Sequence, residues 1–149
     1  MDRIKGIKAS YLSSGLTDVQ IQAIADISEI VEAGDMQEIV TEADDAIDIY
    51  LLLDGNVRVT TVNGDPIARL QSGAIIGEIA LFEGSERSAT VVSDGPSRLV
   101  RIPAHKFNRL MDEQPEIGIV VLRNIGKTLC ARLRSSNVQL EAVLATLPY

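Results

Sequence analysis

The residues best suited to bind a ligand lie close together in the segment IIGEIALFEGSERSATV, from Ile75 to Val91. Arg87 supplies a cation for an anionic group, which backbone N–H groups at the start of a short helix can share. Glu78 only accepts hydrogen bonds when it is ionised, so it suits sugar hydroxyls better than phosphate. Together they predict a site for a ribose phosphate. A structural ion pair between Arg87 and Glu78 is the alternative interpretation.

Composition limits the class of protein. A chain of 149 residues with 46% hydrophobic content is about one domain with enough apolar material for a core. A net charge of −7 and a pI near 4.7 argue against binding to DNA or RNA, which needs a basic surface. The chain has no apolar signal core and no run of about 18 apolar residues. We therefore expect a cytoplasmic protein that does not enter a membrane.

The single cysteine, Cys130, excludes an intramolecular disulfide and fits a reducing compartment. Its neighbours Leu129 and Leu133 predict that it is a small packed side chain. The single histidine, His105, is expected at the surface of a short helix. One histidine is too few for the metal-dependent barrel enzymes or for a catalytic triad with its nucleophile elbow. We therefore expect that the chain is not an enzyme and that it binds neither a metal nor a cofactor.

Charge is unevenly distributed along the chain. No Lys or Arg occurs between Lys8 and Arg58, a stretch that holds eleven acidic residues. Basic residues outnumber acidic ones from Arg98 to Arg134. Solvated faces are the simpler interpretation, and a surface that docks a partner is the alternative.

Hydrophobic spacing predicts helices at both ends and strands between them. Leu16 to Val31 has a mostly helical spacing, with Thr17 or Asp18 as the N-cap. Short apolar runs and turn residues follow from Gln37 to Arg101, and they predict a sandwich or barrel rather than a parallel sheet. The expected strands and turns are a strand at 47–53, a hairpin turn at Asp54-Gly55, a strand at 57–62, a turn at 63–66, a strand at 67–70, and strands at 89–92 and 99–102 separated by Asp94-Gly95-Pro96.

Two helices are predicted to close the chain, one at Lys106 to Met111 and a longer one from Pro115 to about Leu147. The long helix carries a heptad seam of apolar and small residues. A coiled-coil-like homodimer contact is the favoured interpretation, and packing on the chain's own barrel is the alternative. The seam consists of Leu122, Gly126, Leu129, Leu133, Ser136, Leu140, Val143 and Leu147.

This order of elements resembles the cyclic-nucleotide-binding domain of the catabolite activator protein family. The resemblance rests on Gly55 in LLLDGNVRV, on Gly73 and Gly77 before Glu78, and on the run Arg87-Ser88-Ala89-Thr90. It implies an α+β, mainly β fold: an eight-stranded jelly-roll (double-stranded β-helix) barrel with N-terminal helices and a long C-terminal helix. Residues 1–149 would form one domain, with the barrel at about 37–102 and the C-terminal helices at about 103–147.

The resemblance also implies a ligand and its contacts. Glu78 would bind the ribose 2′-hydroxyl and Arg87 the phosphate oxygens, while Arg132 would approach Glu78 from the long helix. Ser136 and Asn137 would reach the base, which favours cyclic AMP. Ser88 also suits guanine, so cyclic GMP remains an alternative. The implied ligand-binding residues are Gly77, Glu78, Ile79, Ala80, Arg87, Ser88, Ala89, Arg132, Ser136 and Asn137.

These expectations describe a stand-alone regulatory module. It would bind a cyclic nucleotide and signal through helix rearrangement to an unknown effector protein. Only EAVLATLPY follows the expected ligand contacts, so no DNA-reading helix is expected. Two alternatives remain open: a degenerate barrel that binds no ligand and acts as a constitutive dimerisation subunit, or the sensor fragment of a larger channel, kinase or transcription factor.

Overall fold

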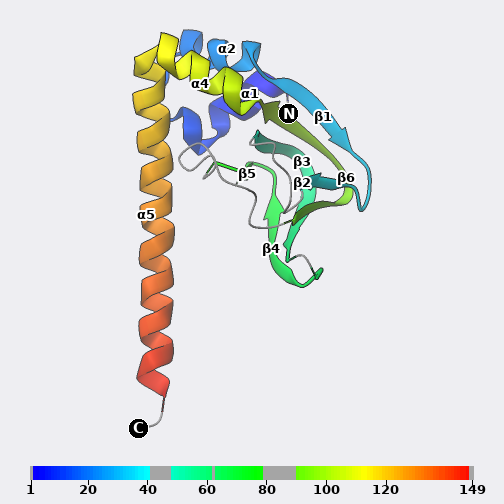
Figure 1. The fold of residues 1–149 in the computed structure, drawn as a ribbon, viewed down its shortest axis with the longest axis vertical. Helices are drawn as coiled ribbons and strands as arrows, with labels where there is room; N and C mark the ends of the chain where they lie inside the picture. Colours follow the sequence, from blue (N-terminus) through cyan, green and yellow to red (C-terminus); the bar gives the residue numbers. More distant parts are fainter. Residues whose placement is uncertain (1, 41–47, 62, 79–89, 148–149) are drawn as a thin grey trace.

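The computed structural model describes residues 2–40, 48–61, 63–78 and 90–147. Figure 1 shows short helices gathered at one end of an antiparallel sheet. The long helix α5 leaves this helical end and runs beside the sheet, and its C-terminal half projects away from the rest of the chain (Figure 1).

The N-terminal part consists of α1 (Arg3–Ala9), the 3₁₀ turn η1 (Tyr11–Ser13) and α2 (Asp18–Asp26). Thr17, one of the two predicted N-caps, is the N-cap of α2, and Asp18 is its first helical residue. Its hydroxyl accepts a hydrogen bond from the Gln20 N–H at 3.2 Å, and the Gln20 side chain accepts one from the Thr17 N–H at 3.0 Å. This reciprocal pair is a capping box, which satisfies two otherwise free donors at the helix start.

The predicted helix from Leu16 to Val31 is too long. Helix α2 ends at Asp26, and strand β1 (Glu29–Ala33) follows. Ile30 and Val31 pair with Val100 and Leu99 of strand β6 (Thr90–Ile102). Their β-branched side chains favour a pleated strand with cross-strand partners over another helical turn.

The sheet is antiparallel and its main path has the order β1-β6-β3-β4. Strand β3 spans Ile49–Thr60 and β4 spans Pro66–Gln71. The short strands β2 (Glu38–Val40) and β5 (Ile75–Ile76) pair with β6 and β3. The mainly β fold with flanking helices is as predicted. The sheet of the described residues has six strands and is not closed, so the eight-stranded barrel is not confirmed.

Two predicted turns are wrong because they lie inside long strands. Asp54-Gly55 falls within β3, and Asp94-Gly95-Pro96 falls within β6. The two strands pair along their length, with register shifts on both sides of Asp54. Gly55 has φ 101°, and a Cβ there would lie 2.7 Å from the Pro96 carbonyl oxygen. These residues therefore bend two paired strands together instead of ending them.

The turn predicted at 63–66 is confirmed. Gly64 has φ 85°, and the Thr61 N–H donates to the Asp65 carbonyl at 2.9 Å. The predicted strand at 67–70 lies in β4, which leaves this turn and pairs with β3.

Buried side chains form two clusters on opposite faces of the sheet. Leu51 and Leu53 point toward the helices, whereas Leu52 between them belongs to the second cluster. This alternation follows from the pleat of β3. The cluster that contains Leu51 and Leu53, here called the helical cluster, also includes the fully buried Phe107 and Ile125. The helices are therefore anchored to the sheet through a continuous apolar layer.

Some of the acidic residues in the first half of the chain pair with basic residues of strand β6. Arg98 of β6 donates to Asp54 at 2.8 Å, and Arg101 donates to Asp48 at 2.8 Å and also to Glu29. Acidic residues of the first half of the chain thus face arginines of the second half. The predicted solvated faces are therefore only part of the explanation, although such exposed pairs contribute little stability.

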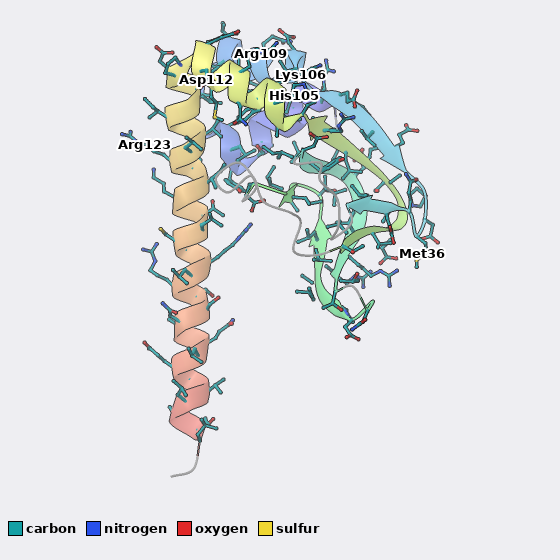
Figure 2. The ribbon with its side chains drawn as sticks, in the orientation of Figure 1. Met36, His105, Lys106, Arg109, Asp112 and Arg123 are labelled. Atoms are coloured by element: carbon teal, nitrogen blue, oxygen red, sulfur yellow. The ribbon has the colours of Figure 1, made fainter. Side chains whose placement is uncertain are left out.

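Helix α4 spans Ala104–Glu113 and α5 spans Pro115–Thr146, close to the predicted bounds. His105 projects outward from α4, as predicted (Figure 2). None of the helices among the described residues is long and apolar enough to span a membrane.

The first half of α5 packs on the core and the second half does not. Ile117, Val121 and Ile125 are fully buried, whereas Leu133 is 63% and Leu140 is 56% exposed. The seam from Leu133 onward therefore does not pack on the chain's own sheet, and the homodimer contact stays a prediction. Cys130 is exposed, so its predicted packing is wrong, because the buried stripe of α5 lies on another side of the helix.

We predict that Gly55→Ala destabilises the fold more than Gly64→Ala. Both glycines have positive φ, which costs an alanine about 1–2 kcal/mol. A Cβ at Gly55 also meets Pro96 and Ser97 within 3.0 Å, whereas a Cβ at Gly64 meets nothing within 4 Å. Urea unfolding should show a loss of about 3 kcal/mol or more at Gly55. Equal losses would contradict the close approach of β3 and β6.

Candidate functional site

Glu78 is the candidate site residue that the structure places most clearly. Strand β5 pairs with β3 through Tyr50–Ile76 and Leu51–Ile75. Gly77 follows with φ 89°, a left-handed conformation that turns the chain directly after the strand. The side chain of Glu78 is only 6% exposed. A buried carboxylate needs hydrogen-bond donors, because losing its hydration is costly.

Arg132 of α5 supplies such a donor. Its Nη1 donates to Oε1 of Glu78 at 2.9 Å, across 54 residues of sequence. The arginine side chain is 56% exposed, so solvent reaches one side of this pair. The expected approach of Arg132 to Glu78 is therefore present, and α5 is connected directly to the loop that follows β5.

The turn η1 is also held against α5, the helix that carries Arg132. The side-chain amide of Asn124, on α5, donates to the carbonyls of Leu12 at 2.8 Å and Ser14 at 2.9 Å. These two bonds hold η1 against α5. Beside them, the Tyr11 hydroxyl is buried and makes no hydrogen bond of ordinary geometry to the residues that the structure describes.

Burial and charge both act on Tyr11. Loss of solvent raises the pKa of Tyr11 to about 12, and the negative charge of Glu78 adds to this effect. The charge of Arg132 partly opposes the rise, and a hydrogen bond toward Glu78 contributes the smallest part of it. The phenol therefore stays protonated at neutral pH. Sequence reasoning missed Tyr11 and Asn124, since their partners are distant in sequence and no local spacing points to them.

Some of the other candidate residues are described by the structure and some are not. Ser136 and Asn137 are exposed on α5, about one helical turn after Arg132. Their role toward a base remains a prediction. Five further candidates lie outside the described residues: Ile79, Ala80, Arg87, Ser88 and Ala89. Among the described residues, Glu78 forms an ion pair with Arg132, and no group of three His, Cys, Asp or Glu residues is arranged to hold a metal ion.

This arrangement suits a ligand that carries hydroxyl groups. The Glu78 carboxylate has two oxygens and about four lone-pair directions, so it can accept bonds from Arg132 and from a ligand hydroxyl. The bond between Arg132 and Glu78 also joins the turn after β5 to α5.

The family model of the cyclic nucleotide-binding domain matches residues 30–114, more than half of the 149 residues. The chain belongs to the cyclic nucleotide-binding domain family. The antiparallel sheet with its flanking helices agrees with the resemblance seen in the sequence. The match includes β1, Glu78 and α4, and it ends just before α5.

Two curated proteins are similar to the chain over more than half of its length. It is 29% identical over 135 residues to Glutaminase 1 of Bradyrhizobium diazoefficiens, covering 91% of the chain and 22% of that protein. It is 36% identical over 95 residues to the cAMP-dependent protein kinase regulatory subunit of Dictyostelium discoideum, covering 59% of the chain and 29% of that protein. The chain thus spans less than a third of the length of these curated relatives.

A solved structure supports the same family. The catabolite activator protein of Thermus thermophilus is 25% identical, with a TM-score of 0.75, over 90% of the chain and 63% of that protein. The likeness therefore includes most of the elements described above, helices as well as sheet.

We predict that Arg132→Ala destabilises the chain by about 1–3 kcal/mol, because it leaves a buried acceptor without its donor. Arg134→Ala is the matched control, since Arg134 is exposed on the same helix and should cost less than about 0.5 kcal/mol. Urea unfolding measures both. Adding Glu78→Gln to Arg132→Ala should recover part of the loss, and a loss equal to that of the control would show that the pair does not stabilise the fold.

Proposed function

We propose that the chain is a regulatory module that binds a cyclic nucleotide and performs no catalysis itself. The observation that carries the proposal is the buried Glu78, held by Arg132 of α5, with Arg87 nine residues later in the sequence. A hydroxyl acceptor and a cation this close in the sequence match a ribose and its phosphate. Membership of the cyclic nucleotide-binding domain family supports the same ligand class.

In this proposal each part of the nucleotide has its own partner. Glu78 accepts the ribose 2′-hydroxyl, and Arg87 holds the phosphate with the N–H groups of residues 79, 80, 88 and 89. Ser136 and Asn137 reach the base from α5. Cyclic AMP is the favoured ligand, and the name of the cAMP-dependent relative from Dictyostelium supports this choice. Cyclic GMP remains the alternative ligand.

The signal would leave the site through α5. Arg132 connects Glu78 to this helix, and the exposed seam that contains Leu133 and Leu140 lies further along it. Two copies of the chain can cover these seams by pairing them. A ligand that changes the bond of Arg132 then changes the helix pair, and helix pairing changes ligand affinity by the same factor. The effector is a cytoplasmic protein, or another part of a longer polypeptide.

Titration calorimetry tests the ligand. Arg87→Ala should weaken cyclic AMP binding at least about tenfold, because a charge-assisted bond to phosphate contributes about 1.5–3 kcal/mol. Glu78→Gln should weaken it less. Arg109→Ala is the control, since Arg109 is exposed on α4 (Figure 2). If the parent chain bound no cyclic nucleotide, the non-binding dimerisation subunit would be the better description. Tight binding by Arg87→Ala would rule out the phosphate role.

The helix seam predicts a homodimer at micromolar concentration. Leu133→Glu combined with Leu140→Glu should give a soluble monomer in light scattering, because two charges would face their copies in the seam. Val138→Glu is the matched control, since Val138 is 65% exposed on α5 but lies off the seam. A monomeric parent chain at high concentration, or a monomer from the control variant alone, would contradict a contact made by this seam.

A further inference from the structure

We propose that Tyr11 is a positioning residue for the site: its hydroxyl is a second donor to the Glu78 carboxylate and acts on ligand binding through it. This inference rests on the proposed function and adds a residue that no sequence motif indicated. The three groups come from three separate elements, which are η1 for Tyr11, the turn after β5 for Glu78 and α5 for Arg132.

The Tyr11 hydroxyl is a buried donor beside the Glu78 carboxylate. It makes no hydrogen bond of ordinary geometry to a described residue, which is uncommon for a buried polar group, although its raised pKa reflects in part a hydrogen bond toward Glu78. The Glu78 carboxylate is close enough for its charge to act on the phenol. Arg132 occupies only Oε1 of that carboxylate. A phenol hydroxyl rotates about its own bond, so a small shift of either side chain completes a hydrogen bond.

The turn η1 is fixed in place by packing and by hydrogen bonds. Leu12 is buried in the helical cluster, and Asn124 holds the carbonyls on both sides of Ser13. The ring of Tyr11 packs against the same cluster. The hydroxyl is therefore presented to Glu78 from a fixed turn, whereas Arg132 approaches on a long and half-exposed side chain. When a ligand hydroxyl competes with Arg132, Tyr11 still keeps the carboxylate in place.

This role has a specific consequence for the ligand. If Tyr11 acts through Glu78, its hydroxyl supports only the contact to the ribose 2′-hydroxyl. A nucleotide that lacks this hydroxyl gains nothing from Tyr11. A purely structural role, in which the hydroxyl stabilises η1 or the core, would affect both nucleotides equally.

The binding test uses cyclic AMP and 2′-deoxy cyclic AMP in titration calorimetry of the full chain. Tyr11→Phe keeps the ring and removes the hydroxyl, and it should weaken cyclic AMP about fivefold while leaving the 2′-deoxy nucleotide unchanged. Ser13→Ala is the matched control, because Ser13 lies on the same turn and its buried hydroxyl has no hydrogen-bond partner among the described residues. It should change neither affinity. Equal losses for both nucleotides with Tyr11→Phe, or no loss for cyclic AMP, would overturn the inference.

A second measurement needs no ligand. The chain has three tyrosines and no tryptophan, so the carbon-13 resonance of the Tyr11 Cζ can be assigned with Tyr11→Phe. Glu78→Gln should move this resonance at neutral pH, and Arg109→Ala should not. A resonance that does not move would overturn the inference about Tyr11. The proposed function would still stand if the parent chain binds cyclic AMP. A parent that bound both nucleotides equally would overturn the ribose role of Glu78, and the inference with it.

Discussion

The buried carboxylate of Glu78 constrains the rest of the site. It lies directly after β5 and is almost fully removed from solvent, so it requires donors from the protein or from a ligand. Arg132 meets this requirement from a helix that is also held to the domain by apolar contacts and by the bonds of Asn124 to η1. Among the described residues, the bond between Glu78 and Arg132 therefore connects the turn after β5 to α5.

The sheet positions this carboxylate through strands that bend rather than end. Gly55 allows β3 to approach Pro96 of β6 more closely than a side chain would permit. The two strands stay paired through the bend and enclose the second apolar cluster. Strand β5 then pairs with the first part of β3 and presents Gly77 and Glu78 toward η1 and α5. The strand geometry and the site are therefore parts of one arrangement.

Several features could be predicted from the sequence because local chemistry determines them. The Thr17 capping box, the turn around Gly64 and the bounds of α5 follow from neighbouring residues. The Asp54-Gly55 pair predicts a hairpin although it forms a bend, since both need a residue with positive φ. No local pattern points to Tyr11, because the charge that acts on it lies 67 positions away in the sequence. The approach of Arg132 to Glu78 followed from the family resemblance alone.

The central claim is that α5 senses the ligand through Glu78, and a double-mutant cycle on affinity tests it most directly. Titration calorimetry would give the cyclic AMP affinity of the parent, Glu78→Gln, Arg132→Ala and the double variant. If Arg132 acts through Glu78, the double variant binds as tightly as Glu78→Gln alone, because the second substitution has nothing left to remove. Losses that simply add would contradict the account, since Arg132 would then contribute independently of the carboxylate it contacts.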